Sequence, residues 1–326
     1  MILLSKADGI DDHRPRKIRR ISYSYNITNL PGDCLNLIFK CLGNKDNRDS
    51  FGLTCRHLLH IQNNYQESLW WSYSDEAHNY PRISPDSFPN VLCKLLIRFQ
   101  LLKYLSFNGR LKITDFARLQ PHSFGSNVQY LCIDDCSEYS DIELSIIFSW
   151  FPRLKDLDLR FSQITDVGLE ALAKCCSSLE KVNLYECHLI TDSGISGCKL
   201  EPEGINAIVS CGRLKYLSLY DLAKVEEGFI NSEAVMMISK GCPLLKTLNL
   251  SYCKGIELEG WEAIGRNCKN LQHLTVYGCN KFCDQGLQAL RIGCNKLSKL
   301  CVDNGISCSS SAIELFKHKR PNCEVS

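Results

Sequence analysis

Residues 271–294 read LQHLTVYGCNKFCDQGLQALRIGC, and this stretch decides the fold of the chain. It opens with the pattern L-x-x-L-x-L, whose apolar positions hold Leu271, Leu274 and Val276. The alternating half of the pattern fits a short strand with one buried face. Apolar residues then recur at the i, i+3, i+7 spacing of an amphipathic helix, at Leu287, Leu290 and Cys294. One strand and one helix of this size cannot bury their apolar faces alone, so neighbours of the same kind are needed.

The same pattern recurs along the chain. Its copies begin at Leu102, Val128, Leu154, Leu179, Leu214, Leu245, Leu271 and Leu297. The steps between copies are 26, 26, 25, 35, 31, 26 and 26 residues, and all 24 L positions are apolar. A period of about 20–29 residues with this core is the signature of leucine-rich repeats. We therefore predict an α/β fold, a leucine-rich-repeat solenoid (a horseshoe of about eight repeats) over residues 101–326.

Nine of the twenty cysteines are in phase with the repeat. Five lie three residues before a copy starts, at Cys176, Cys211, Cys242, Cys268 and Cys294. Four lie eight residues after a start, at Cys136, Cys187, Cys253 and Cys279. We interpret both positions as sites where a small apolar side chain is buried. The alternative is a metal or redox site, but same-phase cysteines lie in different repeats, no CxxC pair occurs, and the histidines match no zinc template.

Composition restricts the class of protein. Hydrophobic residues make up 44% of the chain and charged residues 23%, as in soluble folded proteins. The formal net charge of +2 is too close to zero to indicate a nucleic acid or a membrane as partner. The start, MILLSKADG, has too short an apolar run for a signal peptide, and residues 91–107 carry three basic residues, so no membrane span is expected there. We expect the protein in the nucleus, the cytoplasm or both, where thiols stay reduced.

A second module precedes the repeats. Residues 27–69 read ITNLPGDCLNLIFKCLGNKDNRDSFGLTCRHLLHIQNNYQESL. Helical apolar spacing follows Leu30 and Pro31, at Leu35, Ile38, Phe39 and Leu42. Gly43-Asn44 predicts a break, and a second helix is predicted to carry Phe51, Cys55 and Leu58. About forty residues are too few for an independent core, so a partner that covers their apolar surface is expected.

This module resembles an F-box, and with the repeats the chain resembles plant members of the F-box/leucine-rich-repeat family. The family pattern is matched at Leu30, Pro31, Leu35, Ile38, Phe39, Cys55 and Arg56. Leu58-Leu59 departs from it, because many members place a Trp after the Cys-Arg pair. The cysteine-containing repeats are also similar to those typical of F-box proteins.

The resemblance implies that the module docks on a Skp-type adaptor, which joins it to a cullin and a RING protein. The repeats would then hold a protein substrate for ubiquitination. The adaptor-binding residues implied are Leu30, Pro31, Leu35, Ile38, Phe39, Leu42, Phe51, Cys55 and Arg56. The alternative is that Leu30, Ile38, Phe39 and Leu42 are the core of a helical N-terminal cap.

Four regions are thus predicted. Residues 1–26 form a disordered basic tail, in which five basic residues between positions 14 and 20 are either a nuclear import signal or a solvated tail. Residues 27–69 form the F-box. Residues 70–100 form a linker and the N-terminal cap of the solenoid, with a helix over 91–99. Residues 101–326 form the repeats.

The concave face is where a substrate is expected, because the x positions of each strand point away from the core. Positions two and six after each start are rich in tyrosine. The candidate contacts on this face are Arg160, Tyr185, Tyr216, Tyr220 and Tyr277. Tyrosine supplies a large rigid area and a hydroxyl for recognition. Strands also favour tyrosine regardless of function, so that alternative stays open.

The two long copies carry insertions near residues 195–203 and 225–230, between strand and helix. We predict that they project side by side from one rim and contact the substrate, for example a basic segment. Their acidic candidates are Glu201, Glu203, Glu226 and Glu227. The alternative is two tolerated surface insertions.

The predicted function is the substrate-recognition subunit of an SCF-type (Skp-cullin-F-box) ubiquitin ligase, with no catalytic residues, metal or cofactor of its own. One alternative is a repeat scaffold outside ubiquitination. Another is a small-molecule or hormone receptor of the F-box type, although no basic cluster on the concave positions would hold a polyphosphate. An enzyme is least favoured, because neither a GxSxG nor a P-loop pattern occurs.

Overall fold

A computed structural model describes residues 27–71, 88–108, 127–134, 136–190, 203–210, 212–220, 230–303 and 307–326. The chain forms two compact units, Met1–Gln62 and Asn63–Ser326. In the described ranges, every helix is too short or too polar to cross a membrane.

Short helices make up the described part of the N-terminal unit. They are η1 Ile27–Asn29, α1 Gly32–Cys41, α2 Lys45–Thr54 and α3 Arg56–Tyr65, the last of which continues past the unit boundary. The prediction of a single helix through Phe51, Cys55 and Leu58 is wrong. Cys55 is extended (φ −161°, ψ 167°), which ends α2, and its carbonyl accepts the N–H of Leu59, which starts α3.

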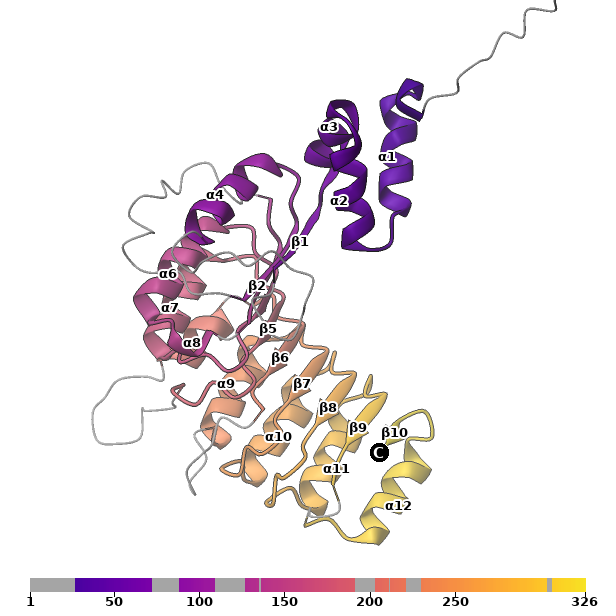
Figure 1. Ribbon diagram of the computed structural model, residues 1–326. Coiled ribbons are helices and arrows are strands. Elements are labelled where there is room, and N and C mark those ends of the chain that lie inside the picture. Colours follow the sequence, from indigo (N-terminus) through magenta and orange to yellow (C-terminus); the bar gives the residue numbers. More distant parts are fainter. Residues whose placement is uncertain are drawn as a thin grey trace, which may run out of the picture. The chain divides into compact units, whose positions relative to one another are not determined.

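The second unit is built on one parallel sheet, whose ten strands follow one another in chain order (Figure 1). The strands are β1 Ser68–Trp71, β2 Tyr104–Asn108, β3 Tyr130–Asp134, β4 Asp156–Asp158, β5 Lys181–Asn183, β6 Tyr216–Ser218, β7 Thr247–Asn249, β8 His273–Thr275, β9 Lys299–Cys301 and β10 Glu324–Val325. Equivalent residues of successive copies pair, for example Leu248 with Leu274 and Leu274 with Leu300.

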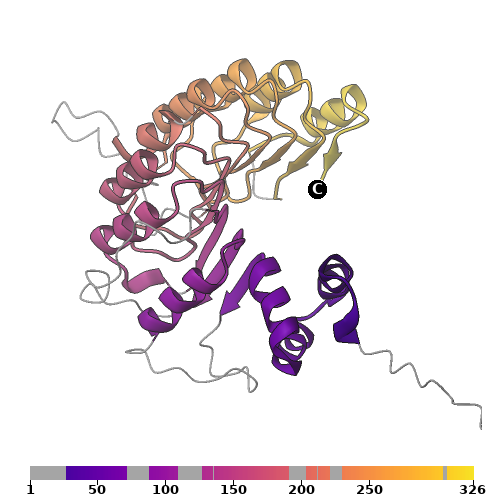
Figure 2. The same ribbon diagram turned by 90° about the horizontal axis from the view of Figure 1, so that it is seen from above.

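Helices cover the outer side of this sheet, while the strands line its inner side (Figure 2). They are α4 Phe88–Arg98, α6 Asp141–Trp150, α7 Asp166–Cys175, α8 Glu203–Ser210, α9 Ser232–Gly241, α10 Leu258–Asn267, α11 Asp284–Gly293 and α12 Ser310–Lys319, with a short 3-10 helix at Cys136–Glu138. The predicted leucine-rich-repeat solenoid is confirmed, and α4 is the helix expected over residues 91–99.

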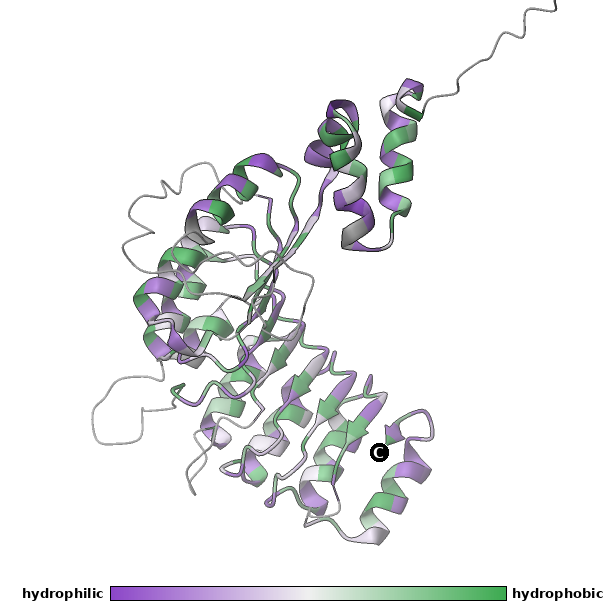
Figure 3. Ribbon diagram, in the orientation of Figure 1, coloured by the Kyte–Doolittle hydropathy of each residue, from purple (hydrophilic) through white to green (hydrophobic). Residues whose placement is uncertain are grey.

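The sheet extends one strand beyond the eight predicted copies at each end. The register of β1 places Gln66 at the first apolar position of the pattern, and that of β10 places Asn322 there. These polar residues break the L-x-x-L-x-L pattern, so the sequence did not predict either strand. Every apolar position of the eight copies is buried except Val302, which is partly buried. Figure 3 shows the resulting hydrophobic residues recurring along strands and helices alike.

The in-phase cysteines belong to this core, as predicted. Eight of the nine are at most 2% exposed, and Cys211 lies outside the described residues. Thiols at the later position also link neighbouring copies: Cys187 Sγ donates to the Leu159 carbonyl at 3.1 Å, and Cys279 Sγ to the Leu250 carbonyl at 3.1 Å. Burial raises the pKa of Cys187 to about 11 and that of Cys279 to about 12. These thiols are therefore protonated packing groups at neutral pH.

Candidate interaction surfaces

Four aromatic rings form a continuous row across the repeats that contain β4, β5, β6 and β7. We call Phe161, Tyr185, Tyr220 and Tyr252 the aromatic row. Tyr185 and Tyr220 stack with ring centroids 4.2 Å apart and planes 13° apart. Phe161 meets Tyr185 edge-on at 5.4 Å, and Tyr252 meets Tyr220 edge-on at 5.2 Å. A stacked pair is therefore flanked by two rings that meet it edge-on. Stacked and edge-on contacts are both favoured geometries for aromatic rings.

The backbone holds the two outer rings in an unusual conformation. Phe161 and Tyr252 both have φ of 63°, in the left-handed region, and Glu186 has φ of 55°. Each lies seven residues after a copy starts, where the chain turns and the next residue, Ser162, Cys187 or Cys253, is buried in the core. The Phe161 N–H donates to the Tyr185 carbonyl at 2.8 Å, which fixes the turn. A left-handed non-glycine residue costs about 1–2 kcal/mol, so the repeat stores strain where it displays these rings.

Gly278 occupies the same seventh position in the next copy, with φ of 66°. A Cβ there would lie 2.5 Å from Cδ1 of Tyr252, so only glycine lets that ring lie in place. The Gly278 N–H donates to Asp303 Oδ2 at 2.7 Å. The other carboxylate oxygen, Oδ1, is buried with no hydrogen-bond partner among the residues described.

The row offers both apolar area and polar groups. Phe161 is 49% exposed and Tyr252 39% exposed. Burial raises the pKa of Tyr185, and hydrogen bonds to Tyr220 and Glu186 raise it further. The Tyr185 phenol therefore stays protonated and can act as a donor. Large, rigid, partly exposed rings with hydroxyl groups are typical of protein-recognition surfaces.

The predicted concave-face residues take different places. Tyr185 and Tyr220 are in the row, and Arg160 lies beside it, where its Nε pairs with Asp158 Oδ1 at 3.0 Å. Tyr216 is half-buried in β6, and Tyr277 lies beyond the row, where its side chain contacts Cys301 and Ser326. The predicted glutamates Glu201, Glu226 and Glu227, and the Glu203 side chain, lie outside the described residues.

Phe161 and Tyr252 were missed by the sequence analysis, which considered positions two and six of each copy. A signal was present, because position seven holds Phe161, Tyr252 and the glycine Gly278 in three copies. A glycine at a repeat position marks a backbone that favours positive φ, so aromatic residues at that position should have been noticed.

A second surface lies on the N-terminal helices. Its exposed apolar side chains are Ile27 (45%), Leu30 (40%), Leu37 (64%) and Leu53 (83%). In the same unit Phe39 and Phe51 are buried and pack with ring centroids 5.5 Å apart. Three helices this short thus form a small core and leave several leucines in water, which favours a partner on this surface.

The residues expected to bind an adaptor divide between surface and core. Leu30, Pro31 and Arg56 are exposed. Ile38, Leu42 and Cys55 are half-buried. Leu35, Phe39 and Phe51 are buried, so they support the helices from within. Leu37 and Leu53, which are the most exposed apolar residues here, were not among the predicted contacts.

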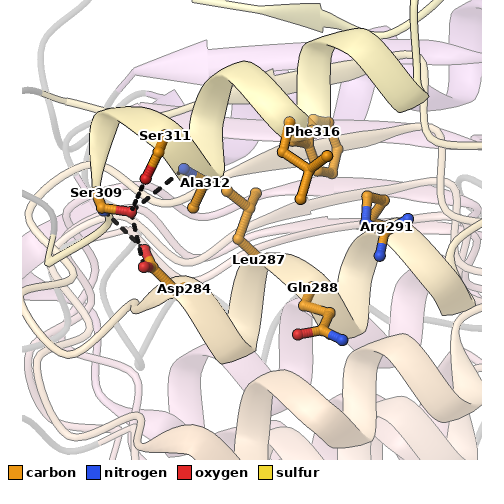
Figure 4. Close-up of a pocket in the computed structure, with 9 residues that line it drawn as sticks. Asp284, Leu287, Gln288, Arg291, Ser309, Ser311, Ala312 and Phe316 are labelled. Carbon is orange, nitrogen blue, oxygen red and sulfur yellow. Dashed lines mark hydrogen bonds between the residues drawn. The ribbon is translucent and has the colours of Figure 1, made fainter.

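A pocket of about 370 Å³ lies between α11 and α12 on the outer side of the repeats (Figure 4). Close packing of the preceding helices depends on glycine: a Cβ on Gly293 of α11 would lie 1.7 Å from the Gly265 carbonyl oxygen. One period later, α12 has Lys319, so it cannot approach α11 as closely. Asp284 closes one end by accepting the Ser309 N–H at 2.7 Å and its hydroxyl at 2.8 Å. No cluster of three or more potential metal ligands occurs among the described side chains.

Comparison with known proteins agrees with this architecture. F-box/LRR-repeat protein 12 of Arabidopsis thaliana is 33% identical over 289 residues, which cover 76% of this chain and 72% of that protein. F-box/LRR-repeat protein 4 of Bos taurus is 24% identical over 173 residues, covering 52% of this chain and 26% of that protein. The Leucine Rich repeat family matches residues 153–173 and 241–265. This chain belongs to the F-box/LRR-repeat family.

Among solved structures, a chain of the yeast Rad7 and Elc1 complex aligns over 91% of this chain and 88% of its own length. Its sequence identity is 16% and the TM-score is 0.38.

Proposed function

We propose that this chain is the substrate-recognition subunit of an SCF-type ubiquitin ligase. The observation that carries the proposal is the exposed apolar surface of the N-terminal helices in a member of the F-box/LRR-repeat family. A Skp-type adaptor covers this surface and joins the chain to a cullin and a RING protein. The chain itself supplies binding surfaces and no catalytic groups, and it acts in the nucleus, the cytoplasm or both.

The adaptor contacts the exposed residues Leu30, Pro31, Leu37 and Leu53. Moving one leucine side chain from water into an interface contributes about 1.5–3 kcal/mol. The buried residues Leu35, Phe39 and Phe51 act indirectly, because they hold the helices that present this surface. Leu37 and Leu53 are 64% and 83% exposed, and a set of exposed apolar side chains on three short helices is typical of a surface that a partner covers.

The protein substrate contacts the aromatic row, with Arg160, Tyr216 and Tyr277 as further contacts on the same face. The glutamates Glu201, Glu203, Glu226 and Glu227 of the two long copies extend this site in the proposal and favour a basic segment of the substrate. Neither a nucleic acid nor a membrane is a partner in this proposal.

Co-purification from cells tests the adaptor step. Leu30→Ala combined with Pro31→Ala is expected to abolish recovery of the Skp-type adaptor and the cullin. Pro243→Ala with Leu244→Ala is a matched control in the repeats, where Leu244 is 45% exposed against 40% for Leu30. Undiminished adaptor recovery by the first variant would contradict the proposal, and adaptor recovery without cullin from the unmodified chain would favour a scaffold outside ubiquitination.

A further inference from the structure

Charge is distributed unevenly around the repeat sheet. Nine loops lead from a described helix into the next strand, over residues 66–67, 99–103, 151–155, 176–180, 211–215, 242–246, 268–272, 294–298 and 320–323. They hold nine lysines and arginines but two acids, Glu67 and Glu180, although the whole chain has 38 basic and 36 acidic residues. We call this edge the amino rim, because the strands begin there. Apart from Cys211, all of its loops are within the described residues.

In the middle of the amino rim, charged residues occupy equivalent positions just before adjacent strands. The N–H of Glu180 donates to the Lys155 carbonyl at 2.7 Å, and the N–H of Lys215 to the Glu180 carbonyl at 2.7 Å. The N–H of Lys246 then donates to the Lys215 carbonyl at 2.8 Å. These residues therefore occupy adjacent rows, which lie about 4.8 Å apart in a sheet. We define the rim patch as Arg153, Lys155, Arg213, Lys215 and Lys246.

Glu180 shows how strongly this patch is positive. Its carboxylate pairs with Lys215 Nζ at 2.7 Å. That hydrogen bond, together with the charges of Lys215, Lys155 and Arg213, holds the pKa of Glu180 below its usual range. The single carboxylate of Glu180 thus offsets one of the five positive charges, and the patch keeps a net positive charge.

The helices explain only part of this basic character. Helix carboxyl ends reach the same rim, and their partial negative charge attracts cations. Lys269 serves this purpose, since its Nζ donates to the carbonyls of Gly265 and Gly293 at 3.0 and 3.2 Å. The side chains of Lys155, Arg213 and Lys246 are different. They are exposed, and they make no hydrogen bond or ion pair with any residue that the structure describes.

We propose that the rim patch binds an acidic segment of a protein partner, rich in aspartate and glutamate, laid across the starts of β4 to β7. Its carboxylates pair with the exposed cations in place of water. A long polyanion such as nucleic acid fits less well, because the chain's net charge is only +2 and acids occupy the first turns of α6, α7, α9, α10 and α11 at the opposite edge. This surface is separate from the aromatic row and does not depend on adaptor docking.

Fluorescence anisotropy with a labelled oligoglutamate peptide and the purified full chain tests the proposal. The triple variant Lys155→Gln, Arg213→Gln, Lys246→Gln is expected to bind about tenfold more weakly, as three surface ion pairs would give. The matched control is Lys40→Gln, Lys94→Gln, Lys254→Gln, three exposed lysines outside the amino rim with the same change in net charge. It is expected to bind like the unmodified chain.

A single reversal, Lys246→Glu, keeps the test valid if the triple variant unfolds, and it should weaken binding in the same direction. Equal losses in the rim and control variants would overturn the proposal, as would failure of the unmodified chain to bind the peptide. Tighter, rim-dependent binding of single-stranded DNA of matched charge would overturn it in favour of a nucleic-acid site.

Discussion

The pattern leucines of the repeats differ from two leucines of the N-terminal helices in how far they are exposed. In the repeats, the pattern leucines are covered by the next copy, and Leu274 has no exposed surface. In the N-terminal helices, Leu37 and Leu53 remain 64% and 83% exposed. Each repeat has a neighbour of the same kind on both sides, whereas three short helices have only one another. The array therefore completes its own core, while the N-terminal helices leave Leu37 and Leu53 uncovered.

The largest expected effect separates these two kinds of leucine. Leu274→Ala removes a fully buried side chain and should lower the free energy of unfolding by about 2–5 kcal/mol. Leu53→Ala removes an exposed one and should change it by less than about 0.5 kcal/mol. Chemical denaturation of the two variants measures both values. Comparable losses would show that Leu53 belongs to a core, and the contrast between the two regions would fail.

A smaller effect is expected at the aromatic row. Gly278→Ala places a Cβ against the Tyr252 ring in a left-handed backbone, and it should lower stability by at least about 1–2 kcal/mol. Gly212→Ala is the matched control, because Gly212 also has positive φ (61°) but open space around a Cβ. Near-ultraviolet circular dichroism should change more for Gly278→Ala. Identical spectra for the two variants would mean that Gly278 does not position Tyr252.

A smaller effect still is expected from the cysteines, which also differ in exposure between the N-terminal helices and the repeats. Cys34 and Cys41 of α1 are exposed, whereas Cys187 and Cys279 are buried. At pH 8, a thiol reagent should modify the first pair rapidly and the second only on unfolding. Labelling followed by peptide mass mapping measures the two rates. Fast modification of Cys187 in the folded protein would contradict its packing role.

Stability should also fall in alkali because of these thiols. The ordinary thiol pKa is about 9, and burial raises that of Cys187 to about 11. As the pH rises, the thiol therefore ionises in the unfolded chain before it ionises in the folded one. The folded state keeps its full stability below about pH 9 and loses stability as the pH rises toward 11. Between pH 7.5 and 9.5 each such thiol should lower the free energy of unfolding by about 1 kcal/mol or less. In denaturation experiments, the free energy of unfolding should fall less steeply with pH for Cys187→Ala than for the unmodified chain. An equal slope would show that the Cys187 thiol does not cause the alkaline loss of stability.

The sequence predicted the repeats well because repetition multiplies a local signal. Leu271, Leu274 and Val276 alone fit many folds, but the same spacing in eight copies fits one. The in-phase cysteines were interpreted correctly for the same reason. The strands β1 and β10 were missed because Gln66 and Asn322 interrupt the pattern, although hydrogen bonds along the sheet still extend to them.

The arrangement of side chains on the candidate surfaces was predicted less completely, because it depends on contacts that spacing does not show. Tyr185 and Tyr220 are 35 residues apart, yet they stack because the insertion between them leaves the strand register intact. Phe161 joins them through a left-handed turn that its own side chain does not favour. In the N-terminal helices, apolar spacing identified Leu35 and Phe39 but could not separate buried from exposed leucines.

The most direct test of the central claim is the affinity of a purified Skp-type adaptor, measured by isothermal titration calorimetry. Leu37→Asp with Leu53→Asp is expected to weaken adaptor binding by at least about hundredfold, because two apolar contacts are lost. Ile142→Asp with Ile292→Asp is the control in the repeats, where these residues are 63% and 62% exposed. The account predicts that this control binds like the unmodified chain. Equal affinities for both variants, or equal losses, would contradict the claim that the N-terminal helices present their uncovered leucines to the adaptor.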